Sequence, residues 1–318
     1  ATVDNANAAT LTIGTGATTL NTSGAGTLTV NGDAGGTAAL TIQGGDADTG
    51  DVTVADYEST GTLTLGNSLN AGAVAITTKG TEGRTIALGT SANVTSRALT
   101  ATTLADGQTL TLTGNKALTL STVSADVNAE AYAGALTATV TNAAAATFQT
   151  GTAASTLTAA GAAALTIDAD AGSGTAGALT IAGDGGGAVS VTGVEANVTL
   201  DDGFTGTGAL SITTGNASMT LALGTSNTSS SRTVNSSGAD TDKTVTLTGS
   251  RALSLTSGEA DIVATDHSGA VTATVDNANA ATLTIGTGAT TLNTSGAGTL
   301  TVNGDAGGTA ALTIQGGD

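Results

Sequence analysis

The chain has 318 residues, of which 25 are acidic and 7 basic, giving a formal net charge of −18 and a pI near 4.1. Without a basic patch it has no means of neutralising phosphates, which excludes nucleic-acid partners. It also lacks the run of about 18 apolar residues that a membrane-spanning helix needs. With aromatic residues at 1% and no Pro or Cys, a wide globular core is excluded as well.

Short bursts of alternating aliphatic and hydroxyl residues predict β-strands along the whole chain. In a strand, a Leu-Thr-Ile triplet places two aliphatic side chains on one face and a hydroxyl on the other. Such triplets occur at 11–13, 28–30, 40–42, 52–54, 63–65, 165–167, 179–181, 189–191, 198–200 and 210–212. Glycine, Asn and Asp between the bursts supply the backbone conformations of tight corners. No segment of helical length shows a period of 3.6, so we expect an all-β chain.

An exact internal repeat indicates a tandem array. The segment from Ala1 to Asp46 returns letter for letter as Ala273 to Asp318, at an offset of 272. A second, older duplication aligns 117–151 with 252–286, where 18 of 35 positions are identical. We therefore expect half-units at 1–136 and 137–272, with 273–318 as the start of the next copy. The chain is interpreted as a window of a longer array, in which each copy adds the same module.

Even spacing, internal repetition and a thin aliphatic core favour a β-solenoid. Strand centres recur at short, even intervals, and we count 13 in each half-unit. Thirteen is prime, so two or three strands per coil cannot make the half-units strictly equivalent. Either one strand is a corner, or each half-unit, 1–136 and 137–272, is a β-sandwich bead on a string. Threonine ladders are expected on the outer face of a solenoid, because their hydroxyls stay hydrated.

Clusters of carboxylates mark the only candidate metal site. Asp46, Asp48 and Asp51 alternate along one turn, and Asp168 and Asp170 form a smaller cluster. Calcium takes about six to eight oxygen ligands, which such residues supply together with loop carbonyls. The alternative is that these are acidic turns on a solvated surface, and no other cofactor is indicated.

Catalytic residues are not expected. The only histidine, His267, aligns with Tyr132 of the other half-unit and is predicted to be an exposed loop residue. Asp266, His267 and Ser268 are sequence neighbours, whereas a catalytic triad converges from separate segments. No phosphate-binding loop of the G-x-x-x-x-G-K-[ST] form is present. The chain is therefore predicted not to be an enzyme.

The stretch 125–140, ADVNAEAYAGALTATV, and the segment 146–157 that follows resemble repeats of bacterial surface-layer proteins and giant adhesins of the RTX type. The LTLTG and VTLTG motifs at 110–114 and 245–249 are similar to strand repeats of autotransporter passengers. This resemblance implies a secreted cell-surface protein with stacked strands and a structural or adhesive role, and the acidic composition of the chain is typical of bacterial exoproteins. The calcium ligands of RTX repeats do not carry over, since Thr stands where Asp is needed in Gly14-Thr-Gly-Ala-Thr-Thr-Leu20.

Two functions from different classes remain. The first is an extracellular structural repeat that forms or extends a fibre, sheath or surface layer, with neighbouring copies as partners end to end and also laterally. The second is the stalk or contact region of a giant adhesin. Tyr57, Tyr132, Phe148 and Phe204 are the only aromatic residues and are scattered, whereas binding faces are enriched in aromatic anchors. The sequence therefore favours the structural function.

Overall fold

The computed structural model describes residues 1–32, 36–44, 50–92, 94–170, 176–225, 232–304 and 310–316. Every regular element in this part of the chain is a β-strand. The strands form two compact units, Ala1–Ser155 and Thr156–Asp318, which are described in turn below.

Unit 1 contains β1 to β15. Their bounds are β1 Thr2–Val3, β2 Ala9–Thr12, β3 Thr18–Thr22, β4 Leu28–Asn31, β5 Leu40–Gly44, β6 Val52–Tyr57, β7 Leu63–Leu65, β8 Ala73–Thr78, β9 Arg84–Ala87, β10 Ser96–Ala101, β11 Thr109–Thr113, β12 Leu118–Val123, β13 Asp126–Asn128, β14 Leu136–Val140 and β15 Ala146–Gln149.

Unit 2 contains β16, which begins at the unit boundary, to β31. Their bounds are β16 Ser155–Ala159, β17 Leu165–Asp168, β18 Leu179–Ala182, β19 Val189–Val194, β20 Val198–Leu200, β21 Leu210–Thr214, β22 Met219–Ala222, β23 Arg232–Asn235, β24 Thr244–Thr248, β25 Leu253–Ser257, β26 Asp261–Val263, β27 Val271–Val275, β28 Ala281–Thr284, β29 Thr290–Thr294, β30 Leu300–Asn303 and β31 Leu312–Gly316.

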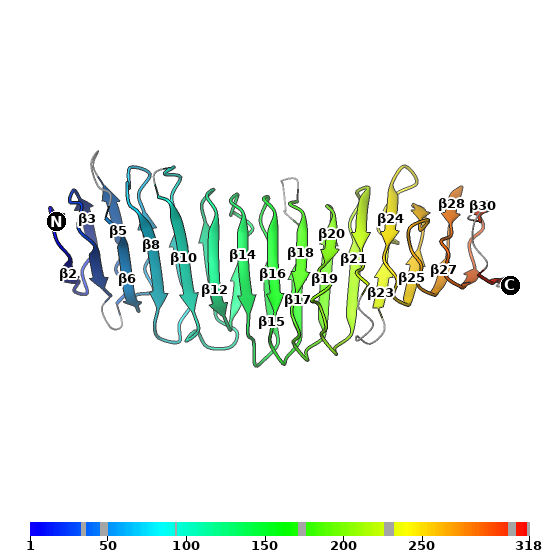
Figure 1. Cartoon of the computed structure of the whole chain (residues 1–318), viewed down its shortest axis with the longest axis horizontal. Coiled ribbons are helices and arrows are strands. Elements are labelled where there is room, and N and C mark those ends of the chain that lie inside the picture. Colours follow the sequence, from blue (N-terminus) through cyan, green and yellow to red (C-terminus); the bar gives the residue numbers. More distant parts are fainter. Residues whose placement is uncertain are drawn as a thin grey trace. The chain divides into compact units, whose positions relative to one another are not determined.

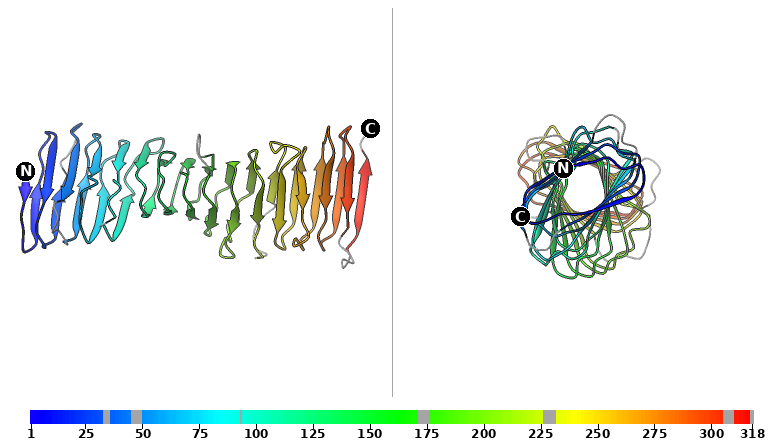
Figure 2. Two further views of the ribbon diagram at one scale, coloured as in Figure 1. Left: turned by 90° about the horizontal axis from the view of Figure 1, so that it is seen from above. Right: turned by 90° about the vertical axis from the view of Figure 1, so that its left-hand side faces the viewer.

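Each unit is a β-solenoid with two strands per turn. Odd-numbered strands pair in parallel with odd-numbered strands and even-numbered with even-numbered, so each unit has two parallel sheets (Figure 1). The chain passes from one sheet to the other at every corner, as the views in Figure 2 show. The expected β-solenoid is confirmed, and the alternative of sandwich beads is wrong because every strand pairs with the strand two places along the chain rather than with its sequence neighbour.

Aliphatic side chains stack inside the coil, one above another. In unit 1, Leu20 pairs with Ile42 and Ile42 with Leu65, and all three are at most 2% exposed. The threonine between each inward pair faces out, as in the ladder of Thr19, Thr41 and Thr64. Burying columns of Leu, Ile and Val between two sheets supplies the main stabilisation, at about 25 cal/mol per Å² of apolar surface.

The length of a turn varies, because the corners absorb insertions. Leu118 pairs with Leu136, which is a short turn, while Arg84 pairs with Leu110, which is a distinctly longer one. The strands keep their inward triplets in register across these differences. Length therefore varies in the loops between strands, and register shifts also occur in the pairings of β6, β12 and β19.

Counterpart strands of the two half-units lie in opposite sheets. Within unit 1, β2 (ATLT) has its sequence counterpart in β15 (ATFQ), thirteen strands later, and the two belong to different sheets. Within unit 2, β17 (LTID) and β30 (LTVN) show the same relation. Thirteen strands at two per turn make six and a half turns. An odd number of strands per half-unit is therefore compatible with a continuous solenoid. It requires neither that one strand be a corner nor that each half-unit be a separate bead.

The exact repeat restores the same strand pairing. Ala9 of β2 pairs with Leu28 of β4, and at the equivalent place in the second copy Ala281 of β28 pairs with Leu300 of β30. Thr18 pairs with Leu40 in the first copy, and Thr290 with Leu312 in the second. The strand number advances by an even amount from β2 to β28, so both copies of a strand belong to the same kind of sheet. One copy of the repeat therefore corresponds to thirteen turns.

Candidate functional site

The corners between strands hold the carboxylates that the sequence singles out. Asp46 and Asp48 lie outside the described residues. Oδ1 of Asp51, just before β6, accepts a hydrogen bond from the backbone amide of Ala73 at 2.7 Å. Ala73 begins β8, one turn further along the same sheet. Oδ1 of Asp168, at the end of β17, accepts a hydrogen bond from the amide of Asp170 at 3.2 Å.

The hydrogen bond from Ala73 to Asp51 is one of several of the same kind. At one corner after another, a carboxylate or amide oxygen accepts a backbone N–H from the next turn. The donor and acceptor pairs are Thr147 to Asp126 at 2.7 Å, Thr220 to Asn197 at 2.8 Å, Thr225 to Asp202 at 3.0 Å, Ala278 to Glu259 at 2.7 Å and Thr282 to Asp261 at 2.7 Å. These side chains thus satisfy amides that the sheets leave unpaired where the chain turns.

Hydrogen bonding to these amides favours the ionised carboxylates. Bonds from the backbone and side chain of Thr225 hold the pKa of Asp202 below its usual value. The amide of Ala278 lowers the pKa of Glu259 in the same way. The acidic corner residues therefore act as interturn caps, a role the sequence shows only through a recurring spacing of about one turn between the acid and the strand whose backbone amide donates to it.

Metal-ligating side chains do not converge in the described part of the chain. No group of three His, Cys, Asp or Glu residues there lies close enough together to hold one ion. Asp51 and Asp168 each use an oxygen on a backbone amide instead.

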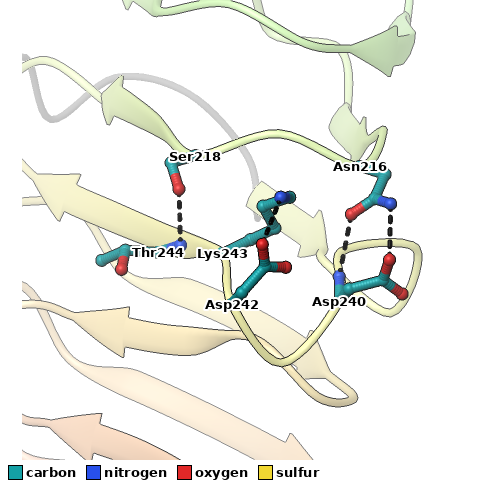
Figure 3. A network of polar contacts seen from close by, with 6 residues as sticks. All are labelled: Asn216, Ser218, Asp240, Asp242, Lys243 and Thr244. Atoms are coloured by element: carbon teal, nitrogen blue, oxygen red, sulfur yellow. Dashed lines mark hydrogen bonds and ion pairs between the residues drawn. The ribbon is translucent and has the colours of Figure 1, made fainter.

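A network in unit 2 shows how two successive corners are joined (Figure 3). Asn216 donates from Nδ2 to Oδ2 of Asp240 at 2.6 Å, and its Oδ1 accepts the amide of Asp240 at 3.1 Å. Ser218 accepts the amide of Thr244 at 3.0 Å, and Lys243 forms an ion pair with Asp242 at 2.7 Å. The reciprocal amide–carboxylate pair fixes the longer corner onto the one before it.

Tyr132 and His267 occupy equivalent corners, and both point inward. Each forms an isolated bridge to a glycine of the previous turn, Tyr132 to Gly114 and His267 to Gly249. The Tyr132 hydroxyl donates to the carbonyl of Lys116. His267 is 1% exposed, so the predicted exposed loop residue is wrong. The backbone bridge to Gly249 explains the error, because it fixes His267 against the preceding turn, where its side chain is buried.

The imidazole of His267 is buried without a good partner. Burial lowers the pKa of His267, and the carbonyls of Thr248 and Arg251 offset part of that effect. Neither carbonyl, however, lies within hydrogen-bonding geometry of Nδ1 or Nε2. Burial therefore favours the neutral form of the ring.

All four arginines are also buried. Arg84, Arg97, Arg232 and Arg251 are between 2% and 6% exposed. Arg84 donates to the carbonyls of Lys79, Glu82 and Gly83, and Arg97 to that of Ser91. The sequence contains a signal for this burial, since each arginine stands two residues before an inward aliphatic residue, as in Arg97-Ala-Leu99. The guanidinium groups of Arg84 and Arg97 thus anchor corner carbonyls and are removed from the surface.

A hollow of about 440 Å³ lies beside Arg84. Glu58, Thr60, Thr81 and Glu82 contribute to its lining. The guanidinium of Arg84 is already committed to three loop carbonyls. The hollow is therefore formed by corner loops of unequal length rather than by converging binding groups.

Comparison of the chain with protein-family models, with curated proteins and with solved structures finds no match in any of the three. Among the described residues, no helix is both long and apolar enough to cross a membrane.

Proposed function

We propose that this chain is an extracellular structural repeat that forms or extends a fibre, sheath or surface layer by stacking β-strands. The observation that carries the proposal is the second copy, whose strands pair in the same registers as those of the first. Thirteen turns at about 4.8 Å per strand correspond to about 62 Å of stacked sheet per copy. The number of copies of the repeat would then set the length of the fibre.

The side chains support a structural role over a catalytic one. The single histidine is buried, and the acidic residues at the corners cap the backbone of the next turn. The absence of Cys and the acidic composition suit a protein outside the cell, where solubility and resistance to oxidation matter. The proposal includes no catalytic step.

A second candidate is the stalk of an adhesin. Tyr57, Tyr132, Phe148 and Phe204 are all at most 3% exposed, so the described surface offers no aromatic anchor for a ligand. A repeat of this kind would space a binding head from the cell rather than bind by itself.

Electron microscopy of the native material distinguishes the two candidates. Ordered filaments or a lattice with an axial repeat of about 62 Å, which is thirteen turns at the strand spacing, would support the structural proposal. Isolated tethers, each ending in a distinct head, would overturn it in favour of the stalk.

A further inference from the structure

The odd-numbered sheet of unit 2 has a regular outward face. From β21 to β31 the strand register continues without a shift. One outward column runs through Ser211, Thr233, Ser254, Thr272, Thr291 and Thr313. A second column, two residues further along each strand, contains only Thr, Asn and Gln. The face is thus a two-column array of short polar side chains.

This array is uncharged in a strongly acidic chain. The chain carries a net charge of −18, yet neither column contains an acidic or basic residue. Four acids of this region, Asp240, Asp242, Asp266 and Asp276, lie in the corners. Two chains that approach through corners would bring like charges together, whereas two that approach through this face would not.

The spacing of the array suits a partner with the same period. Like residues repeat along each column at about 4.8 Å, and paired sheets of stacked Ser, Thr and Asn side chains interdigitate at about 10 Å. A second copy of the chain has the same spacing on the same face. We propose that this face packs laterally against the same face of a second copy, which rests on the proposed structural function and names its lateral contact.

The area of the face limits the size of the contact. Six strands at about 4.8 Å and five residues at about 3.3 Å give about 480 Å² per partner, or about 950 Å² in total. This falls below the roughly 1,200 Å² of a stable interface. A single chain should therefore pair weakly, and pairing should strengthen as further copies add area. High salt should promote it, because screening shortens the Debye length from about 30 Å at 0.01 M to about 3 Å at 1 M and so weakens repulsion between corners.

The test is sedimentation and negative-stain microscopy of the full chain at about 0.01 M and about 1 M salt, over a range of protein concentrations. The face variant is Ser211→Glu with Thr272→Glu, which buries like charges between paired faces. The control is Thr241→Glu with Thr265→Glu, which adds the same charge at exposed corner positions. Circular dichroism and melting temperature check that each variant folds, and if the double face variant does not, its two single variants carry the test.

We expect side-by-side pairs of the wild type and the control at high salt, and single solenoids of the face variant. Pairing of the face variant at the wild-type concentration, or single wild-type solenoids under every condition, would overturn the inference. End-to-end filaments that never pair side by side would overturn this inference alone. Isolated tethers without either contact would overturn the proposed function as well.

Discussion

At the corner where one half-unit has Tyr132, the other has His267, and the exchange removes a satisfied hydrogen bond from the core. The Tyr132 hydroxyl donates to Lys116, while the ring nitrogens of His267 have no partner in hydrogen-bonding geometry. A neutral imidazole carries one N–H, and charging the ring would place a cation in a buried site. The fold therefore favours the neutral form of His267.

Replacing His267 with the residue of its sister corner should remove a pH dependence of stability. The folded chain has a lowered pKa at His267, whereas the unfolded chain binds a proton near the ordinary value of about 6.5. The contribution of neutral His267 to the free energy of unfolding is therefore fully present above about pH 6.5. It is lost as the pH falls below about 6.5, by up to about 1.4 kcal/mol per pH unit. Urea unfolding between pH 7 and pH 5 should show the wild type losing more stability than His267→Tyr.

Carboxylates also titrate toward the acid end of that range, so the difference between the two proteins is the informative quantity. Equal losses in both would show that His267 does not resist protonation in the fold. The reciprocal variant, Tyr132→His, should acquire the same sensitivity in unit 1.

A second residue-scale prediction concerns the interturn caps. Asp261 accepts the amide of Thr282, and at the corner of Asn197 an amide oxygen accepts the equivalent bond from Thr220. Asp261→Asn should therefore keep the bond, and Asp261→Ala should lose about 0.5–1.5 kcal/mol of unfolding free energy. Chemical denaturation of the two variants checks this, and an alanine variant as stable as the asparagine variant would contradict the capping role.

At the scale of the element, tight stacking of corners depends on glycine. A Cβ added to Gly187, between β18 and β19, would lie 1.8 Å from the carbonyl oxygen of Ala163 in the previous turn. At the adjacent Gly186, the nearest atom is the Thr207 hydroxyl at 3.9 Å. The two glycines therefore differ in how closely a neighbouring turn approaches, and they form a matched pair for substitution.

Gly187→Ala should destabilise unit 2 by about 1–3 kcal/mol, since the backbone of two turns must separate to admit the methyl group. Gly186→Ala should be neutral or stabilising by up to about 1 kcal/mol, because it restricts the unfolded chain. Thermal melts of the two variants compare them directly. Similar losses in both would mean that the corner relaxes freely and that stacking there is loose.

The strands could be predicted from the sequence, whereas the contents of the corners could not. Leu-Thr-Ile triplets encode both the strand and its inward face, so segments such as β5 and β17 match the predicted triplets. The alternation stops where the strand stops, and it gives no direction for a residue such as His267. The orientation of His267 depends on a bridge to Gly249, which lies in the preceding turn of the coil.

The caps escaped prediction for a related reason. The amide of Thr147 bonds to Asp126 of the preceding turn, and the spacing between the two has meaning only once the length of the turn is known. The arginines were predictable in principle, since Arg232-Thr-Val234 continues the period of two. Their charge argued for the surface, and the loop carbonyls that satisfy such guanidinium groups are visible only in the structure.

For the whole molecule, the two copies of the β5 sequence show how much the next turn contributes to the burial of a strand. Leu40 and Ile42 are at most 1% exposed where β7 follows and pairs with β5. Their counterparts Leu312 and Ile314, in β31, are 40% and 57% exposed. The sequences are identical, so the difference in burial reflects the neighbouring turn alone.

Chains of one, two and three copies of the repeat should therefore gain stability per copy as each internal junction forms. Each junction buries columns of Leu and Ile that a free end exposes, and it pairs strand edges that otherwise recruit other chains. One copy should associate end to end through such edges, and strands like Leu40–Gly44, aliphatic and uncharged, favour that pairing. Melting temperature and sedimentation of the three lengths provide the measurement. If one copy is monomeric and melts at the same temperature as three, the copies do not stabilise one another, and the array would be a string of independent solenoids rather than a continuous fibre.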